Sequence, residues 1–480
     1  MTSAPFSPHA ADPDDASPDA ASLDSTSPDS ASPDSASPDG ARADGGARAL
    51  SHAYLPRSGT DDFSVLSYDL DLSYKVATNR LDATAVIRGR ANVRLSAISL
   101  DLVHLRAKRV RLDGDKRTRF TQSPTHVRVK AAKPLAAGTE FTLEIAYDGS
   151  PVPRRTRWGS LGWEELTDGV IVASQPSGAP TWFPCNDRPS DKAAYRITIT
   201  TEQPYTVLAT GELVDHAVSG GRGTWTFDRP EPTATYLAAV QIGRYVLEPR
   251  RTDGVEWVIA YPPALARRVL ADFAPVGRMI ECFQERFGPY PFPSYTVVVT
   301  EDPLEIPLEA QGMATFGSTH VDGRGGSERL IAHELAHQWF GNSVGVAGWA
   351  DIWLNEGFAC YAEWIWSEYS GGPSANTLAR SHHAVLRVKP KDLVLADPGV
   401  DDMFDDRVYK RGACLLHALR RRLGDEVFFD LVRGWSAAHR FGTASTADFE
   451  AFAAGFSDEP LDEFFDAWLR ETRLPSLSAP

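Results

Sequence analysis

The chain has 480 residues and a formal net charge of −15, with 42% hydrophobic and 24% charged residues. This length has room for two or three domains of roughly 150 residues each. No uninterrupted apolar run approaches the ~18 residues that a membrane-spanning helix needs. Nucleic-acid binders normally present a basic face, which the negative charge argues against. The composition therefore favours a globular protein that binds neither nucleic acid nor membrane.

The acidic residues are concentrated at the N-terminus. Residues 1–50 contain nine Asp and two Arg, which leaves a net charge of −8 for the other 430 residues. The triplet Ser17-Pro18-Asp19 recurs with a five-residue period, in variant form, as far as Ser37-Pro38-Asp39. Such a segment has almost nothing apolar to bury, so residues 1–58 are predicted to form a disordered acidic tail. A partner-binding role for this tail is the less favoured alternative.

The cysteines indicate a reducing environment. The chain has four, all far apart in the sequence and without a C-x-x-C pair: Cys185, Cys282, Cys360 and Cys414. This pattern favours buried thiols over a disulfide framework or a cysteine zinc site. The N-terminus also lacks the basic start and apolar stretch of a secretory signal. A cytoplasmic location is therefore expected.

Alternating apolar and polar residues from about residue 63 predict a β-rich domain over residues 59–246. In the first run, Leu66, Tyr68, Leu70, Leu72 and Tyr74 are expected to point to one face of a half-buried strand. Similar runs at 86–95, 141–147, 193–199 and 224–227, separated by Gly, Pro and Asp turns, predict a large antiparallel sheet.

Helical spacing dominates the second half of the chain, over residues 247–480. A helix is predicted over 264–287, ended by Gly288-Pro289 and followed by a strand over 295–299. From Ser327 onward the pattern is mainly helical, up to a last amphipathic stretch at 461–469. The predicted fold class is α+β with several domains, the β-rich domain preceding a mainly helical one.

A metal-binding pattern lies in the apolar helical stretch that begins at Leu330. It reads His333-Glu334-Leu335-Ala336-His337. Residues four apart lie on the same helix face, so His333 and His337 can bind one metal ion. Glu334 is rotated by about 100° from His333, near the position of a metal-bound water. The pattern alone favours a zinc hydrolase but does not establish one.

Glu356 supplies the third ligand that a catalytic zinc site needs. It lies nineteen residues after His337, which leaves room for a second helix to return alongside the first. Other candidate ligands are weaker. A third His six residues after His337 would indicate a different zinc-site pattern, but position 343 is Ser. The tandem His382-His383 is explained by a solvated helix face. The ligand set favours one zinc ion per chain, although Co²⁺ or Mn²⁺ could bind there. Zinc would activate the attacking water, and Glu334 would act as the general base.

These motifs resemble the zinc aminopeptidases of the gluzincin clan, the group of alanyl aminopeptidase and leukotriene hydrolase. The resemblance runs from about residue 60 to the end of the chain. It is carried by four segments in the family's order: Trp182–Asp187 with Lys192-Ala193, Phe287–Phe292, His333–Asn342 with Trp353–Phe358, and Tyr409–Ala413. It implies a saddle-like β domain followed by a thermolysin-like catalytic domain.

The resemblance also implies three further site residues. Tyr409 matches the family's oxyanion-stabilising Tyr, a phenol suited to donate a hydrogen bond to a developing negative charge. Glu309 matches the family's Glu that holds the substrate's α-amine, and Glu305 is the alternative residue for this role. Gln175 matches the family position that makes a second contact to the same amine. The surrounding segment departs from the family, because Pro307 and Ala310 replace its Ala and Asn. First-residue specificity is therefore left open.

The expected function is removal of N-terminal residues from peptides with a free N-terminus. The chain stops about seventy residues after Tyr409, so the family's C-terminal helical domain is expected to be missing and the cleft more open. This departure leaves room for two alternatives: a related hydrolase acting as endopeptidase or epoxide hydrolase, and a non-catalytic scaffold that binds peptides. The sequence does not indicate an oligomeric state.

Overall fold

The structure is a computed structural model of the chain, and it describes residues 54–477. Most of the predicted tail lies outside the described residues. Its last residues are packed: Tyr54 is 3% exposed, and its hydroxyl donates to Asp397 Oδ1 at 2.6 Å. Burial of this aromatic ring against the helical domain is favourable in free energy, so Tyr54 belongs to the packed part of the described chain.

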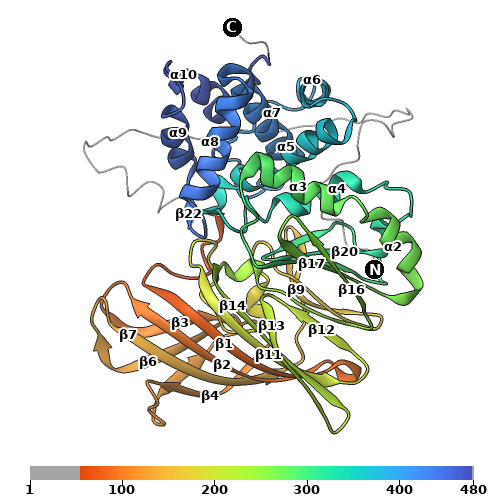
Figure 1. Ribbon diagram of the computed structural model, residues 1–480. Helices are drawn as coiled ribbons and strands as arrows, with labels where there is room; N and C mark the ends of the chain where they lie inside the picture. Colours follow the sequence, from red (N-terminus) through yellow and green to blue (C-terminus); the bar gives the residue numbers. More distant parts are fainter. Residues whose placement is uncertain (1–53, 478–480) are drawn as a thin grey trace, which may run out of the picture.

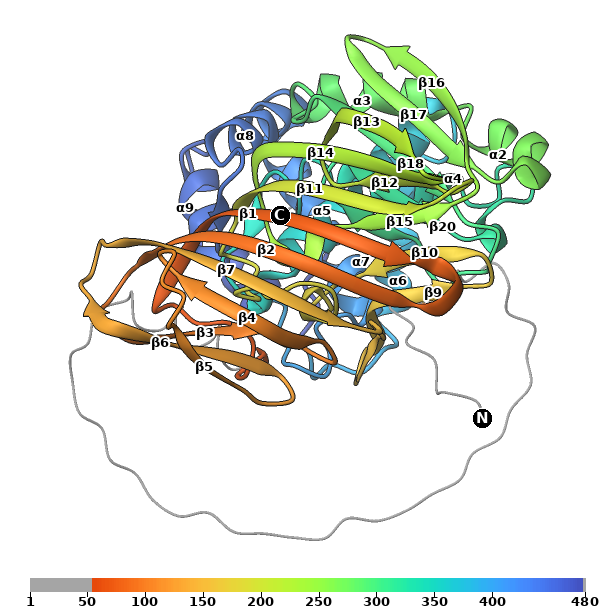
Figure 2. The ribbon, with the colours of Figure 1, turned by 90° about the horizontal axis from the view of Figure 1, so that it is seen from below.

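A seven-stranded sheet forms the body of the β-rich domain (Figure 1). Its spatial order is β13-β14-β11-β1-β2-β7-β4. The strands are β1 (Phe63–Lys75), β2 (Arg80–Ala91), β4 (Arg106–Leu112), β7 (Glu140–Gly149), β11 (Ala193–Glu202), β13 (Glu212–Ser219) and β14 (Arg222–Thr233). Figure 2 shows β14, β11, β1 and β2 side by side across the broad face of this domain.

Two details of this sheet differ from the prediction. The sheet is not wholly antiparallel, because β1 pairs with β11 in parallel register. The register between β1 and β2 also shifts between Val65 and Ser67, so Val65 is buried and Leu66 only half-buried. A bulge of this kind adds one residue and reverses the facing of the side chains before it. Alternation in a single sequence reveals neither the partner strand nor a bulge.

Two smaller sheets complete the β-rich domain. The first has the order β3-β6-β5 and consists of β3 (Leu95–Asp101), β6 (His126–Leu135) and β5 (Arg119–Gln122). The second has the order β12-β15-β10-β9-β8, with β8 (Arg154–Thr156), β9 (Gly159–Leu166), β10 (Gly169–Ala173), β12 (Thr206–Ala209) and β15 (Val240–Gly243). The predicted strand at 86–95 is divided between β2 and β3 by a turn.

A separate five-stranded sheet begins at Val246. Its order is β16-β17-β18-β20-β19, made of β16 (Val246–Thr252), β17 (Val255–Tyr261), β18 (Ser294–Val299), β19 (Leu308–Ala310) and β20 (Met313–Phe316). The sheet lies below the helices (Figure 1), and its inward residues share one hydrophobic core with them. This change of sheet supports a domain boundary near residue 246, which stays a prediction.

The remaining elements are mainly helices. They are α2 (Ala266–Asp272), α3 (Val276–Phe287), α4 (Glu328–Ala336), α5 (Trp353–Ser370), α6 (Ala375–Leu386), α7 (Asp406–Leu423), α8 (Asp425–Ala438), α9 (Thr446–Ala454) and α10 (Asp462–Phe465). Short strands β21 (Gly345–Val346) and β22 (Thr443–Ala444) pair in parallel. The single helix predicted over 264–287 is divided into α2 and α3, because Pro275 lacks the N–H that an unbroken helix needs. No helix in residues 54–477 is both long and apolar enough to cross a membrane.

Lys192 joins the two halves of the molecule. Its ammonium group donates hydrogen bonds to the carbonyl oxygens of Asn342 at 2.9 Å, Ser343 at 2.9 Å and Gly442 at 3.1 Å. These carbonyls follow the zinc-binding pattern in the chain and precede β22. The segment that precedes β11 therefore fixes the loop that follows the His333–His337 pattern.

Asp187, in the same segment, is expected to make stability depend on pH. Burial and the neighbouring Asp101 raise the pKa of Asp187 to about 7 from its ordinary value of 3.8. The folded state then holds a proton that the unfolded state has lost, so this contribution to stability is present below pH 3.8 and is lost as pH rises toward 7. Asp187→Asn is therefore expected to raise the free energy of unfolding by up to about 4 kcal/mol at pH 8, with little effect at pH 4.

Urea unfolding of wild type and variant at the two pH values measures this difference. The exposed Asp458→Asn is the matched control, because it makes the same chemical change at the surface. An equal shift of the urea midpoint at both pH values would contradict the assignment.

Candidate metal centre and active site

The two histidines of the sequence pattern lie at the C-terminal end of α4. His333 is in its last turn and His337 directly follows it, and their exposed fractions are 1% and 2%. The ring centroids are 4.8 Å apart. The spacing of four residues thus brings both imidazoles to one buried point on the helix face, as predicted.

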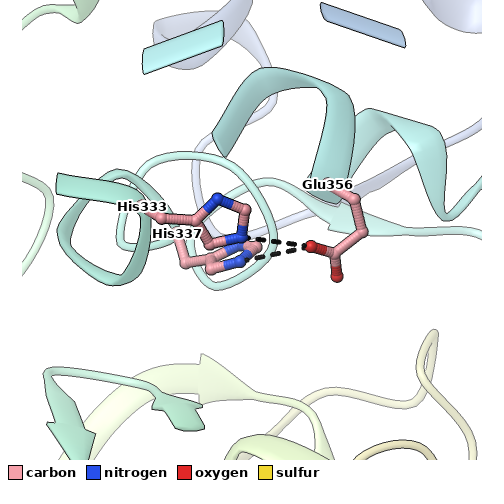
Figure 3. Close-up of side chains that lie close together, drawn as sticks. All are labelled: His333, His337 and Glu356. Carbon is pink, nitrogen blue, oxygen red and sulfur yellow. Dashed lines mark ion pairs between the residues drawn. The ribbon is translucent and has the colours of Figure 1, made fainter. Parts of the chain in front are cut away.

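Glu356 reaches the same point from the first turn of α5 (Figure 3). Its Oε2 atom is 3.5 Å from His333 Nε2 and 3.4 Å from His337 Nε2. The three potential ligand atoms all lie within 4.8 Å of one another. The structure therefore brings together the two imidazoles and the carboxylate that the sequence proposes as metal ligands.

Hydrogen bonds orient both imidazole rings. His333 Nδ1 lies 2.8 Å from Glu363 Oε1, and His337 Nδ1 lies 3.1 Å from the carbonyl oxygen of Phe340. Because Nδ1 is the donor in each pair, Nε2 is the ring nitrogen that faces Glu356, and once deprotonated it is the atom that can bind a metal ion. Sequence reasoning missed Glu363, although it lies two turns after Glu356 on one face of the same helix.

The charges at this site fit a divalent cation. Four carboxylates meet here, from Glu309, Glu334, Glu356 and Glu363. Among the described residues, Arg329 at 3.2 Å and Lys410 at 3.8 Å are the cations that pair with Glu363. Two negative charges remain, and a buried charge needs a partner. Two imidazoles and one carboxylate, with Glu334 nearby, match the donor set of catalytic zinc sites.

The histidines and Glu356 attract one another strongly even without a metal ion. Burial opposes a charged His337, but the charges of Glu356 and Glu309 outweigh it and raise the pKa of His337 to about 10. Burial likewise opposes a charged Glu356, but His337 and His333 lower the pKa of Glu356 to about 2. Protons on the imidazoles thus stand in for the positive charge of a metal ion.

Glu334 lies beside the ligands without serving as one of the three. It is 2% exposed, and its Oε2 atom has no hydrogen-bond partner in the structure. Burial raises the pKa of Glu334 above its ordinary value. An unpartnered buried carboxylate with a raised pKa next to a metal site is suited to accept a proton from water.

Glu309 lies on β19, close to both Glu334 and His337. Carboxylate oxygens of Glu309 and Glu334 and a nitrogen of His337 lie within 4.8 Å of one another. Gln175 Nε2, from the β-rich domain, donates to Glu309 Oε1 at 2.5 Å. Burial raises the pKa of Glu309 to about 8, so its charged form gains from a cation. Glu305, the alternative anchor, is exposed at the surface.

Two side chains that follow the zinc-binding pattern hold β19 in place. Gln338 Oε1 accepts from the backbone N–H of Gly312 at 2.8 Å, and its Nε2 donates to the carbonyl oxygen of Ala310 at 3.2 Å. Asn342 Nδ2 donates to the same carbonyl at 2.9 Å. The position of Glu309 is therefore fixed relative to α4, even though the residues around Glu309 depart from the family pattern.

Tyr409, in the first turn of α7, stacks on His333. The ring centroids are 6.1 Å apart with an angle of 21° between planes. Burial and the charges of Glu356, Glu309 and Glu334 raise the pKa of Tyr409 well above its ordinary value, so the phenol keeps its proton. A close approach of α5 and α7 sets this position: a Cβ atom on Gly357 would lie 2.9 Å from Gly412 Cα.

Sequence reasoning also missed a second phenol, that of Tyr236. Its hydroxyl accepts from Asn355 Nδ2 at 3.3 Å and lies 3.5 Å from the carbonyl oxygen of Gly341. Burial and the charges of Glu309 and Glu356 raise its pKa well above the ordinary value. Tyr236 lies about a hundred residues from the zinc-binding pattern in the sequence, and no local signal marked it.

The tandem histidines lie on α6 and take part in packing. His382 stacks on Trp364 with the ring centroids 5.3 Å apart, and His383 Nε2 is 2.7 Å from the carbonyl oxygen of Pro475. Both are half-buried, so they belong to the packed surface of α6 rather than to a fully solvated one. The structure does not bring them to the metal centre.

Replacing Glu363 with Gln is expected to weaken zinc binding by about 10- to 100-fold. Gln keeps an oxygen for His333 Nδ1 but loses the charge that raises the basicity of the ring and balances Arg329 and Lys410. Competition with a chromophoric chelator measures the zinc Kd. Glu368→Gln, on the same helix but outside the site, is the matched control, and equal Kd values for both variants would show that packing alone orients His333.

Comparison with known proteins gives the same family for both halves of the chain. Residues 64–237 match the Peptidase M1 N-terminal domain, and residues 272–468 match the Peptidase family M1 domain. The chain belongs to peptidase family M1. Zinc is the cofactor that membership of this family implies, and the site described above has the donors to hold it. The predicted resemblance and the order of a β-rich and a helical catalytic domain are confirmed.

Similar proteins include aminopeptidases and solved metallopeptidases. Aminopeptidase M1 of Arabidopsis thaliana is 27% identical over 341 residues, which cover 66% of this chain and 38% of that protein. Aminopeptidase N of Lactococcus lactis is 28% identical over 324 residues, or 62% of this chain and 38% of that protein. The chain thus spans less than half the length of these curated relatives.

A solved relative shares nearly the whole described fold. The M1 zinc metallopeptidase of Deinococcus radiodurans has a TM-score of 0.83 and 28% identity, over 90% of this chain and 99% of that one. A variant of that enzyme has been solved with a Tyr-Ser-Ala substrate, again with a TM-score of 0.83 and with 29% identity. The arrangement of a β-rich domain and one helical domain is therefore found in solved members of the family.

Proposed function

We propose that the protein is a zinc-dependent aminopeptidase that hydrolyses the first peptide bond of peptides with a free N-terminus. The observation that carries this proposal is the position of Glu309, whose carboxylate lies beside both Glu334 and the metal ligand His337. A carboxylate held there can accept charge-assisted hydrogen bonds from an ammonium group. It would thus place the α-amine one residue away from the bond that is cut.

The proposed residues divide the reaction among them. His333, His337 and Glu356 would hold zinc, which supplies a Lewis acid and lowers the pKa of its bound water. Glu334 accepts the proton of the attacking water and delivers it to the leaving amine. Tyr409 donates a hydrogen bond to the oxygen of the scissile carbonyl as negative charge develops there. Glu309 and Gln175 hold the α-amine and so fix the register of the substrate.

The names of the relatives support this assignment. The two curated relatives described above are named aminopeptidases, and a variant of the solved metallopeptidase has been captured with a Tyr-Ser-Ala substrate. We also propose a cytoplasmic location, supported by the four cysteines, all of which are buried free thiols.

Hydrolysis of aminoacyl-arylamides, each compared with its N-acetylated form, tests the proposal. The wild type is expected to cleave the free-amine substrates and to leave the acetylated ones intact. Glu309→Ala is expected to lower kcat/KM by about 10²-fold or more, because a charge-assisted contact to the substrate is lost. Glu305→Ala, which removes an exposed carboxylate from the same segment, is the matched control and is expected to match the wild type.

Zinc content measured on the same samples makes the outcome decisive. Cleavage of acetylated substrates would identify an endopeptidase, and cleavage of an epoxide alone would identify an epoxide hydrolase. A zinc-loaded wild type that cleaves none of these compounds would identify a peptide-binding scaffold.

A further inference from the structure

A basic surface stands out on the β-rich domain of this acidic protein. Residues 102–135 contain ten Lys and Arg against two Asp, whereas the whole chain carries a net charge of −15. Seven of these cations are exposed and make no ion pair within residues 54–477: Arg106, Lys116, Arg117, Arg119, Arg128, Lys130 and Lys133. The other three, on β4, pair with acidic side chains of the neighbouring strands.

Three of the unpaired cations line a groove on the β3-β6-β5 sheet. The groove has a volume of about 680 Å³, and the residues around it are Ser96, Ala97, Thr118, Arg119, Phe120, Thr121, Arg128 and Lys130. Figure 2 shows β5 and β6 at the margin of the β-rich domain, away from the helices. The groove is therefore separate from the metal centre.

The strand register forces the cations of this groove together. Arg119 lies directly opposite Lys130, and Arg128 lies opposite Thr121 on the same pair of strands. The alternate residues Val127, Val129 and Ala131 are buried in the core beneath. Like charges in directly opposed positions destabilise a sheet, and no carboxylate of the described part of the chain forms an ion pair with these cations. Such an arrangement indicates a surface that is stabilised by an anionic ligand.

The N-terminal segment of the chain approaches this groove. The carbonyl oxygen of Arg57 lies 3.1 Å from His126 Nε2, at the first residue of β6 and two residues before Arg128. The first described residue is Tyr54. Fourteen residues, 40–53, separate it from Asp39, the last Asp of the acidic repeat. Fully extended, they would span up to about 50 Å, so the repeat has ample length to reach the groove.

We propose that this groove binds the acidic repeat of its own chain, residues 17–39. The Asp side chains of the repeat would pair with Arg119, Arg128 and Lys130 and relieve their mutual repulsion. A tethered segment has an effective concentration on the order of millimolar, which favours it over a free acidic partner of the same chemistry. The contact is electrostatic and exposed, so salt weakens it.

A fluorescent peptide of residues 11–40 tests the proposal by competition with the tail. It is titrated with the full wild-type chain and with a full chain in which five Asp of the repeat are neutralised: Asp19→Asn, Asp24→Asn, Asp29→Asn, Asp34→Asn and Asp39→Asn. In fluorescence anisotropy at 0.05 M salt, roughly tenfold or more tighter binding to the neutralised chain is expected, because its groove is open. Binding is expected to be lost at about 0.5 M salt.

Two further variants in the neutralised chain locate the binding surface. Arg119→Ser, Arg128→Ser and Lys130→Ser together are expected to abolish peptide binding. Arg387→Ser, Lys389→Ser and Lys391→Ser remove the same charge from exposed positions of the helical domain and are expected to leave it unchanged. Arylamide hydrolysis by all variants reports that they remain folded.

Equal affinity of the peptide for wild type and neutralised chain would overturn the proposal, since the groove would then be open to an anionic partner from outside. Absence of binding to either chain would overturn it as well, because the groove would not recognise the repeat. The comparison of these two chains decides the matter even if the groove variant fails to fold.

Discussion

Replacing Glu334 with Gln is expected to lower kcat for a free-amine arylamide by about 10³-fold, within the range for a lost general base. Gln has nearly the same shape but cannot accept the proton of the attacking water. In the structure, Glu334 Oε2 is buried without a hydrogen-bond partner, so no structural contact of that atom is lost. Zinc content is therefore expected to stay at one ion per chain.

The pH profile distinguishes a base from a residue that only supports the site. Burial raises the pKa of Glu334, so the wild type should lose activity as pH falls and this carboxylate becomes protonated. The residual activity of Glu334→Gln should lack that acidic limb. Glu328→Gln makes the same change in the first turn of α4, where the side chain contacts Trp366, and serves as the matched control. An unchanged kcat for Glu334→Gln, or an acidic limb in its profile, would place the base elsewhere.

The metal ligands could be predicted because their geometry is local. His333 and His337 are separated by one helical turn, and Glu356 lies where a second helix can return, so spacing predicted that these three side chains meet. Glu363 lies on the same face of α5 as Glu356, two turns further along the helix. A search of that face for a second carboxylate could have found it. It forms ion pairs with Arg329 and Lys410. Its role went unnoticed because second contacts to a ligand have no fixed spacing.

Residues brought together from distant segments required the family resemblance. Gln175 and Glu309 are 134 positions apart, and no periodicity in the sequence predicts their contact. Tyr236 shows the limit of both approaches, since neither spacing nor the family segments indicated it. The parallel pairing of β1 with β11 was missed for the same physical reason: alternation reports which face is buried but not which strand lies alongside.

Some differences had a signal in the sequence. Pro275 interrupts the predicted helix at 264–287, and the residue before a proline is disfavoured in helical conformation. Tyr54 is an aromatic residue close to the start of the first strand, and it marks where the chain can begin to bury apolar surface. The boundaries of elements were therefore less predictable than their order, because tertiary contacts decide where each one ends.

Replacing Tyr409 with Phe is expected to lower kcat by about 10²- to 10³-fold, the usual loss when one donor to a developing oxyanion is removed. Phe keeps the ring that stacks on His333, so packing of α7 and zinc binding should persist. Because the hydrogen bond forms as negative charge develops, KM should change much less than kcat. Steady-state kinetics with a free-amine arylamide and zinc analysis measure both.

Tyr236→Phe is the matched control, since it removes the other phenol near Glu309 and Glu356. The hydroxyl of Tyr236 is engaged with Asn355 and the carbonyl oxygen of Gly341, whereas an oxyanion donor has to be directed at the substrate. A loss of well under tenfold is expected from this control because it removes a structural contact rather than a contact to the transition state. A larger loss from Tyr236→Phe than from Tyr409→Phe would instead assign the oxyanion to Tyr236, the phenol that neither spacing nor family resemblance had indicated.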